Sequence, residues 1–421
     1  MSIPAGSARN AIVVGSGFVG AACAWRLARD GWRTEIVDPG DALLAASWGN
    51  AGHLAIEQTA PLASLATLRA LPRRLFAFGG PVGLHLRDAA SWLPFGLRLI
   101  AATRPARFAR ATVALGSLLS IAIPAWRRLA AETGTAALIR ADGHFVAWES
   151  AESAAQGRRA WLASDLGEAT ARDASREELA VLRDLFAGRP VGAMRFANTG
   201  QVVDIPALRE GLSEAFRAAG GTLRTARAAG IEIEDGRAAL RLADTTRLRA
   251  DLVVIAAGIG SAGLLASLAG PVPLIAERGY HVETAEGIDV WPASLPPVAF
   301  EDRSVIVTRF SGTLRLAGFT EFASAAAPPD PRKWDRLDRH ADALGLPSSG
   351  GRKRWMGARP TLPDYLPAIG RSPVAANLLY AFGHQHLGVT LAAATGEIVA
   401  ALARNARTEI SLAPFDLQRF A

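Results

Sequence analysis

The chain has 421 residues, of which 50% are hydrophobic and 20% are charged, and its formal net charge is +7. This length predicts two domains, and this composition excludes a disordered protein. The single cysteine, Cys23, excludes an internal disulfide and a cysteine-based metal site. The basic residues are scattered among acids and are not interleaved with aromatic residues, so we expect no nucleic-acid partner.

The apolar segments indicate where the protein works in the cell. No apolar run reaches the roughly 20 residues needed to span a bilayer, and the most apolar stretch, residues 113–125, is short. The first apolar segment begins near Ala11 and runs into a glycine loop, which is typical of a buried strand and not of a signal peptide. We therefore expect a cytoplasmic protein. Peripheral attachment to the inner face of the cell membrane, through a basic face, is the alternative.

The N-terminal segment predicts a dinucleotide site. Residues 11–14 are a short β-branched run, residues 21–29 are helical in pattern, and residues 34–37 form a second strand. The glycines between the first strand and the helix suit a tight turn and a close approach to a pyrophosphate, while an acid about 20 residues later can hold a ribose hydroxyl. The residues expected to contact the dinucleotide here are Gly15, Ser16, Gly17, Phe18, Val19, Gly20 and Asp38.

The middle of the chain predicts helices followed by a second sheet. Helical patterns cover residues 62–78, 90–102 and 108–129. A strand at 143–148 begins the sheet, and strands at 304–308 and 314–318 form a hairpin around Ser311-Gly312. A strand at 201–204 leads into a helix that ends near Ala219.

The last third carries a long, irregular pattern that ordinary core packing does not require. Residues 357–370 place Arg359 in what we interpret as a proline-bounded turn. A strand follows and ends at Gly383, which precedes the histidine pair His384 and His386. A helix then opens near Gly388.

Four segments together resemble the D-amino-acid oxidase superfamily of FAD-dependent amine oxidoreductases. They are residues 47–54 (Ser-Trp-Gly-Asn-Ala-Gly-His-Leu), 251–258, 277–281 (Glu-Arg-Gly-Tyr-His) and the run from residue 357, and the resemblance extends from about residue 11 to 405. Within the superfamily the chain is most similar to bacterial D-amino-acid and D-hydroxyproline dehydrogenases. Their helical insertion resembles the one expected here at about 61–132.

The resemblance implies an α/β fold, α+β overall. A Rossmann-like FAD-binding domain, formed by residues 1–60, 200–274 and 354–421, would be interleaved with a mixed-sheet substrate domain, formed by residues 61–199 and 275–353. FAD would be non-covalent, because no cysteine near the C-terminus is present to link it. The N-terminus of the helix near Gly388 would face the flavin and stabilise its reduced, anionic form. Further residues implied to contact FAD are Ser47, Asn50, Ala51, Gly52, Ala228, Ala257, Gly258, Gly383, Gly388, Val389 and Thr390.

The resemblance also implies oxidation of an amino acid at Cα, with hydride transfer to flavin N5 and formation of an imine. Arg359 would bind the substrate carboxylate, since a guanidinium grips a carboxylate through two bonds. A structural pairing of Arg359 with Asp364 is the alternative. His384 and His386 would bind substrate, the latter where glycine oxidase has an arginine.

Two further residues complete the expected substrate site. Tyr280 would line the substrate pocket, and His53 would lie near the flavin, with a solvated loop histidine as its alternative. We assign no general base and expect no metal site.

The substrate is ranked by resemblance alone. The histidines favour cis-4-hydroxy-D-proline, which would give 1-pyrroline-4-hydroxy-2-carboxylate, because a polar site discriminates for a hydroxyl. The alternatives are a broad D-amino-acid dehydrogenase acting on D-alanine or D-proline, a glycine- or sarcosine-type oxidase and, remotely, a tRNA-modifying flavin domain. The electron acceptor stays open between a quinone, a partner protein and oxygen.

Overall fold

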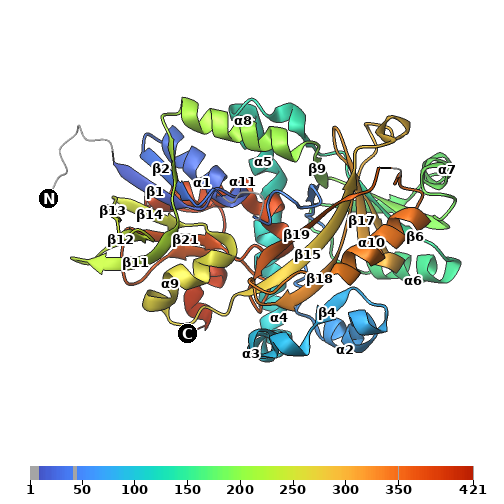
Figure 1. Ribbon diagram of the computed structural model, residues 1–421, viewed down its shortest axis with the longest axis horizontal. Helices are drawn as coiled ribbons and strands as arrows, with labels where there is room; N and C mark the ends of the chain where they lie inside the picture. The colour runs from blue at the N-terminus through green and yellow to red at the C-terminus, as the bar shows by residue number, and fades with distance from the viewer. Residues whose placement is uncertain (1–8, 41–44, 349, 421) are drawn as a thin grey trace.

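The computed structural model describes residues 9–40, 45–348 and 350–420, and two large sheets stand side by side in it (Figure 1). The six-stranded sheet has the order β10-β2-β1-β14-β21-β20. All neighbours are parallel except β20, which is antiparallel to β21. The strands are β10 (Thr222–Thr225), β2 (Arg33–Asp38), β1 (Asn10–Val14), β14 (Leu252–Ile255), β21 (Leu378–Phe382) and β20 (Ala368–Arg371).

Both faces of this sheet are covered, which explains why its strands are apolar runs. Ala11 and Val13 of β1 belong to the core beneath three helices on one face, whereas Ile12 and Val14 pack on the other face. The helices on the first face are α1 (Phe18–Arg29), α8 (Ile205–Ala218) and α11 (Gly388–Ala403). The second face carries α9 (Ser261–Ala269) and a three-stranded sheet of β11 (Ala228–Glu234), β12 (Arg237–Leu242) and β13 (Arg247–Arg249).

The nine-stranded sheet is mixed and has the order β19-β15-β18-β17-β16-β6-β8-β7, with β4 paired to β18. Its members are β19 (Lys353–Thr361), β15 (Ile275–Thr284), β18 (Leu314–Ala323), β17 (Val305–Arg309), β16 (Val298–Phe300), β6 (His144–Trp148), β8 (Gly192–Ala197), β7 (Thr170–Asp173) and β4 (Val82–Leu84). Helices α6 (Ala151–Leu162), α7 (Arg176–Leu185) and α10 (Pro331–Ala343) flank it (Figure 1). The predicted α/β class is confirmed, as are the strand near 143–148 and the hairpin around residues 311–312.

A small third sheet joins distant segments between the two large ones. It contains β3 (His53–Leu54), β9 (Gly200–Val202) and β5 (Ile139–Arg140) in the order β3-β9-β5. The strand predicted at 201–204 therefore pairs with β3 and β5, not with the six-stranded sheet.

The helical insertion holds α2 (Leu65–Arg74), α3 (Ala89–Ala102), α4 (Pro105–Ser120) and α5 (Ala122–Glu132). The expectation that no apolar stretch is long enough to span a bilayer is wrong by length and composition. The helical stretches Pro105–Glu132 and Gln385–Ala403 have 28 and 19 residues, and each contains an 18-residue window with a mean hydropathy of 1.5. These windows are 50% and 72% buried, and core helices pass the same test.

The interpretation of Arg359 as part of a proline-bounded turn is also wrong. Arg359 and Pro360 lie within β19, which pairs with β15 in antiparallel register. A proline is tolerated there because β19 is the edge strand of its sheet and needs no hydrogen bond on its open side. The domain boundary expected at residue 354 falls inside this strand, which the pairing places in the nine-stranded sheet.

Candidate active site

A cavity of about 1410 Å³ extends from the six-stranded sheet to the nine-stranded sheet. Val14, Val37 and Ala256 line it at the carboxyl ends of β1, β2 and β14, which is where open α/β sheets bind their ligands. Glu277 and Gly279 of β15 line it on the opposite side. The cavity therefore has one end formed by backbone and glycines and another formed by polar side chains.

The glycine turn after β1 brings backbone against backbone. Gly15 has φ +106°, and a Cβ there would lie 2.5 Å from the carbonyl oxygen of Ala256. A Cβ on Gly20 would lie 2.0 Å from the carbonyl oxygen of Gly15, so only glycine lets α1 start this close to the turn. Ser16 N donates to Asp38 Oδ2 at 2.8 Å, and Phe18 N donates to Ser47 Oγ at 3.1 Å. These two bonds fix the loops around the turn.

The residues predicted to contact the cofactor divide into two groups. Those that line the cavity are Gly15, Ser16, Gly17, Val19, Asp38, Ser47, Asn50, Ala51, Ala228, Ala257, Gly258, Gly388 and Val389. Phe18, Gly20, Gly52, Gly383 and Thr390 lie behind this lining in the described part of the chain. Phe18 packs edge-on against Trp48 at 4.8 Å, and Gly52 and Gly383 supply positive φ angles in turns. This second group shapes the wall of the cavity from behind.

The N-terminus of α11 is held rigidly where it meets the cavity. Trp126 Nε1 donates to the carbonyl oxygens of Val389 at 2.8 Å and Thr390 at 3.1 Å. Thr390 Oγ1 accepts a bond from Ala55 N at 3.0 Å. Gly388 and Val389 line the cavity, so the positive end of the helix dipole faces it.

Arg359 lies at the polar end of the cavity, beside Glu277. Its Nη1 is 3.5 Å from Glu277 Oε1, and the two residues are direct cross-strand partners. Thr361 Oγ1 donates to the other carboxylate oxygen of Glu277 at 2.8 Å. The Arg359 side chain keeps 26% of its surface exposed, whereas Glu277 keeps 2%. The expected alternative, a pair between Arg359 and Asp364, is not formed, because Asp364 pairs with Arg419 at 2.7 Å.

Gly279 makes room for this guanidinium. A Cβ at Gly279 would lie 2.2 Å from Arg359 Nη2, so the guanidinium crosses directly over the glycine backbone. The contact with Arg359 on β19 thus explains the glycine of the Arg-Gly-Tyr sequence at 278–280.

His386 is a partly buried, hydrogen-bonded histidine in the cavity wall. Its Nε2 donates to Gln58 Oε1 at 2.8 Å. Burial lowers the pKa of His386 to about 4; the charges of Glu277 and Glu57 oppose this shift, and those of Arg359 and His53 add to it. At neutral pH the ring is therefore uncharged and can serve as a hydrogen-bonding group.

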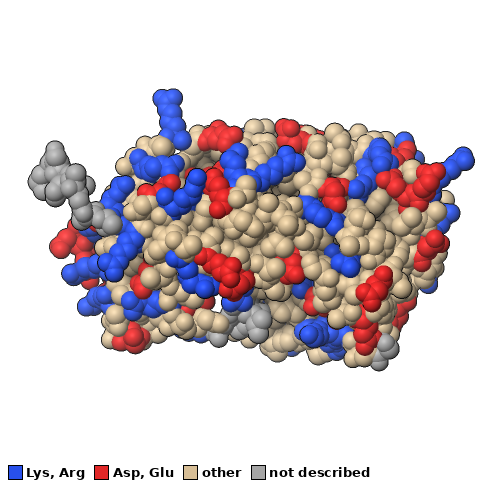
Figure 2. Space-filling model, turned by 90° about the horizontal axis from the view of Figure 1, so that it is seen from above, with Lys and Arg blue, Asp and Glu red and all other residues tan. Residues whose placement is uncertain are grey.

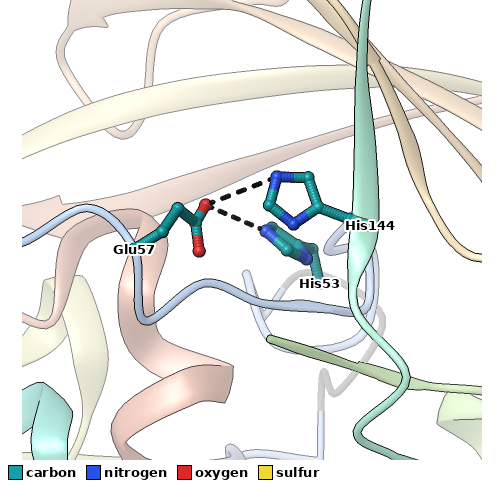
Figure 3. Close-up of side chains that lie close together, drawn as sticks. All are labelled: His53, Glu57 and His144. Carbon is teal, nitrogen blue, oxygen red and sulfur yellow. Dashed lines mark hydrogen bonds and ion pairs between the residues drawn. The ribbon is translucent and has the colours of Figure 1, made fainter. Parts of the chain in front are cut away.

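Three further polar residues meet in the same wall (Figure 3). His53 Nε2 is 3.2 Å from Glu57 Oε1, and His144 Nε2 is 3.9 Å from the same oxygen. Burial alone would raise the pKa of Glu57, but the charges of His53 and His144 and the His53 hydrogen bond lower it to about 2. His53 is thus a cavity residue and not a solvated loop histidine.

Tyr280 and His384 reach the cavity, but their polar atoms are engaged elsewhere. Tyr280 donates its hydroxyl to Glu321 Oε2 at 2.6 Å and accepts a bond from Asp330 N at 3.1 Å. His384 Nε2 bonds Thr395 Oγ1 at 3.0 Å, and burial lowers its pKa to about 3. Of the five predicted substrate residues, Arg359, His386 and His53 therefore have the side chains best placed for polar contact.

Sequence reasoning missed four polar residues of the wall: Glu57, Gln58, His144 and Glu277. Glu57 and Gln58 follow the segment 47–54, which carries the family resemblance. Their spacing from His53 did not predict a contact, because the conformation of a loop cannot be read from spacing. His144 is far away in the chain and comes near only because β6 passes beside the small sheet.

Comparisons with known proteins agree with this geometry. Residues 10–402 match the DAO family of FAD dependent oxidoreductases. A D-amino-acid oxidase of Bradyrhizobium diazoefficiens is 31% identical, with 98% of this chain and 99% of that protein covered. A D-amino acid dehydrogenase of Cereibacter sphaeroides is 28% identical over 97% of this chain and 95% of that protein. The crystal structure of glycine oxidase from Geobacillus kaustophilus has a TM-score of 0.71 at 22% identity, covering 98% of this chain and 99% of that one.

The chain therefore belongs to the DAO family of FAD-dependent oxidoreductases, as its motifs predicted. The cavity fits FAD, the cofactor of this family. Its glycine end is a cradle that side chains would fill, since a Cβ on Gly17 would lie 3.0 Å from Ser47 Oγ. Asp38 lies at that end beside the glycine turn, and the N-terminus of α11, which also lines the cavity, would favour negative charge on a bound cofactor.

Proposed function

We propose that this protein oxidises a D-amino acid at Cα. The curated relatives described above are a D-amino-acid oxidase and a D-amino acid dehydrogenase, and both are covered over nearly their whole lengths. FAD supplies the acceptor for the Cα hydrogen, which leaves as hydride. The nitrogen loses a proton, so the amino acid gives up two electrons and becomes an imine.

Arg359 carries this proposal. Its guanidinium stands at the cavity wall with one contact to Glu277 and a quarter of its surface free, which leaves donors for a substrate carboxylate. A carboxylate bound there would be oriented by a group that cannot lose its charge. The N-terminus of α11 would favour negative charge on the cofactor at the end of the transfer.

We further propose cis-4-hydroxy-D-proline as the preferred substrate, with 1-pyrroline-4-hydroxy-2-carboxylate as product. The pair formed by His386 and Gln58 supports this choice, because it offers an amide and an imidazole beside Arg359 in the cavity wall. A substrate hydroxyl could bond to His386 Nδ1 or Gln58 Nε2, the nitrogens that the bond between the two residues does not use, and a substrate without a hydroxyl would make no such bond. D-alanine, D-proline, glycine and sarcosine remain competing substrates.

Anaerobic bleaching of the flavin tests the substrate. The panel contains both isomers of 4-hydroxyproline, D- and L-proline, D-alanine, glycine and sarcosine. Rapid bleaching by cis-4-hydroxy-D-proline, much faster than by D-proline, supports the proposal. Equal rates with many D-amino acids would indicate a broad dehydrogenase, and no bleaching by any amine would contradict amino-acid oxidation altogether.

We propose that FAD is bound without a covalent bond. The only cysteine, Cys23, is fully buried in α1, and burial raises the pKa of its thiol to about 12. A buried, protonated thiol is a poor nucleophile. Acid precipitation should leave all of the yellow colour in the supernatant, whereas colour in the pellet would show a covalent link.

We also propose peripheral attachment to the inner face of the cell membrane, with a quinone as the electron acceptor. Large hydrophobic residues are exposed mainly on the helical insertion, whose helices α2 and α3 lie along the lower edge of the molecule (Figure 1). Phe78, Leu86 and Val113 have 75%, 87% and 75% of their surface exposed. The full set on the insertion is Leu62, Leu65, Phe78, Leu86, Leu93, Leu97, Ile100 and Val113.

Co-sedimentation with anionic phospholipid vesicles tests this attachment. The double variant Phe78→Ser and Leu86→Ser should lose binding, whereas the control Leu223→Ser, exposed by 63% on β10, should keep it. Binding that is equal in both variants, or absent in the native protein, would contradict the proposal.

The electron acceptor is tested separately. Readmitting air after flavin reduction separates an oxidase from a dehydrogenase.

A tRNA-modifying role finds less support in the surface. Basic and acidic side chains are interspersed on the face seen in Figure 2, and neither sign forms a continuous track there. Nucleic-acid binding depends on concentrated positive charge. A gel shift with tRNA at low salt would revive this function, and its absence would end it.

A further inference from the structure

The cluster of His53, Glu57 and His144 has the arrangement of a metal site. One ligand atom from each residue lies within 4.8 Å of the others. In Figure 3 both imidazoles turn a nitrogen toward the same carboxylate oxygen, Glu57 Oε1. All three side chains line the cavity, so an ion has a path to them.

The remaining ring nitrogens are engaged away from the cluster. His53 Nδ1 is 3.2 Å from the carbonyl oxygen of Gly200, and because a carbonyl can only accept, this nitrogen carries the hydrogen. His144 Nδ1 is 2.8 Å from Thr199 Oγ1. Metal-binding histidines are typically held in this way, by a bond from the second ring nitrogen to a carbonyl or another oxygen.

The carboxylate at the centre of the cluster is only partly satisfied by the protein. Glu57 is 3% exposed, and its Oε2 has no hydrogen-bond partner among the described residues. The ring centroids of His53 and His144 lie 4.5 Å apart, and both rings approach Glu57 Oε1. Because a buried carboxylate is stable only when it is paired, a cation at this point would be favourable.

A divalent ion would satisfy all of these atoms together. Ligands at about 2.0–2.1 Å in tetrahedral geometry are separated by about 3.3 Å. The two distances to Glu57 Oε1, 3.2 and 3.9 Å, require only small side-chain shifts to reach that value. Two imidazoles and one carboxylate are a ligand set that suits zinc and leaves a fourth position open, here toward the cavity.

We propose that His53, Glu57 and His144 bind one divalent transition-metal ion of the zinc type in the wall of the active-site cavity. The open position would hold water or an oxygen of a bound ligand. No role in amino-acid oxidation is needed for the ion to bind, so the proposal does not depend on the substrate.

A second cluster, of one histidine and two carboxylates, provides a comparison. His85, Glu321 and Asp330 also lie within reach of one another. Here the carboxylates already have cations, because Lys333 Nζ is 3.2 Å from both of them and Arg278 pairs with Glu321. This cluster is neutralised by protein side chains and needs no ion.

The test uses untagged, FAD-loaded protein, so that no histidine tag competes for metal. The protein is stripped with a chelator, dialysed against zinc sulfate and then against buffer, and its zinc is measured by elemental analysis. We expect one zinc ion per chain. Glu57→Gln and His144→Asn should each weaken zinc affinity by at least about 100-fold, and Thr199→Val, which removes only the support of His144, by about 10-fold or more.

The matched control is His85→Gln in the neutralised cluster, which should still bind one zinc ion. FAD content and melting temperature show whether each variant is folded. If the folded native protein does not bind one zinc ion per chain, the proposal is overturned without any variant. Zinc binding that is unchanged in folded Glu57→Gln, or lost in folded His85→Gln, would also overturn it.

Discussion

Arg359 and Glu277 face each other across strands β19 and β15, with Nη1 of the arginine 3.5 Å from Oε1 of the glutamate. The Glu277 side chain is buried and bonded to Thr361, so its position is fixed and it holds the guanidinium at the cavity wall. The bond is long and leaves part of the arginine free. This is the arrangement expected of a residue that is positioned by one carboxylate in order to bind another.

Replacing Arg359 should therefore weaken substrate binding. We expect Arg359→Lys to lower kcat/KM by about 100-fold, because a lysine keeps the charge but loses the two-bond grip. Rapid-mixing measurement of flavin reduction gives the effect on substrate affinity. Arg419→Lys is the matched control, since it loses a pair with Asp364 behind the cavity. Equal losses in both variants would contradict a carboxylate-binding role.

A substitution at Gly279 should displace the guanidinium of Arg359 without removing it. A methyl group there would lie 2.2 Å from Arg359 Nη2, so Gly279→Ala should displace the arginine and raise KM by about 10-fold or more, with FAD still bound. Gly96→Ala in α3 is the control, because a Cβ at Gly96 meets nothing within 4 Å. An unchanged KM in Gly279→Ala would show that the position of Arg359 does not control binding.

The start of α1 should control cofactor affinity. In Gly20→Ala the new methyl group would lie 2.0 Å from the carbonyl oxygen of Gly15, so the helix must move away from the turn. At a cost of about 1–3 kcal/mol, the FAD dissociation constant should rise by about 5- to 150-fold. Flavin fluorescence on dilution measures this, with Gly116→Ala as a control at an open helical position. Native affinity in Gly20→Ala would contradict the close approach.

Acid should destabilise the protein partly through His340. Arg303 Nη1 lies 2.8 Å from His340 Nδ1, so that nitrogen accepts the bond and must be unprotonated. Burial, followed by the charge of Arg303, lowers the pKa of His340 to about 4, whereas an unfolded histidine has a pKa of about 6.5. At a pH between these two pKa values, His340 is protonated in the unfolded chain but not in the folded protein. The free energy of unfolding must therefore decrease as the pH falls.

The variant His340→Gln isolates this contribution, since glutamine can accept the same bond but does not titrate. Its free energy of unfolding should fall less steeply with pH between about 6.5 and 4, by at most about 1.4 kcal/mol per pH unit. Urea unfolding across that range gives both slopes. Parallel slopes in the two proteins would show that His340 takes up its proton equally in both states.

The sequence predicted the parts of the fold whose signals lie within one short, continuous segment. β1, the glycine turn, α1 and β2 form one continuous segment, and each has its own signal in hydrophobic pattern or glycine spacing. The start of α11 was found for the same reason, because Gly388 and Val389 follow directly on a strand and a turn. The family motifs then implied the cofactor.

Other features depend on contacts between segments that are far apart in the chain, and the sequence alone did not predict these contacts. Pro360 suggested a turn because its place at the edge of a sheet could not be known before the sheet order was seen. The importance of Glu277 emerges only when β19 sets Arg359 opposite to it. His144 and Glu57 carried no signal at all, because their proximity results from the packing of β6 against the loop after β3.

The contact between α1 and α11 determines how a substitution far from the cavity would affect cofactor binding and turnover. A Cβ on Gly396 would lie 2.9 Å from the backbone carbonyl of Ala22, so the two helices cross almost in backbone contact. The first turns of α1 and α11 both line the cavity. The crossing of the two helices therefore fixes the distance between their first turns. A substitution at Gly396, remote from any bound molecule, would loosen the cofactor and slow turnover together, and an activity screen alone would mistake it for a catalytic residue.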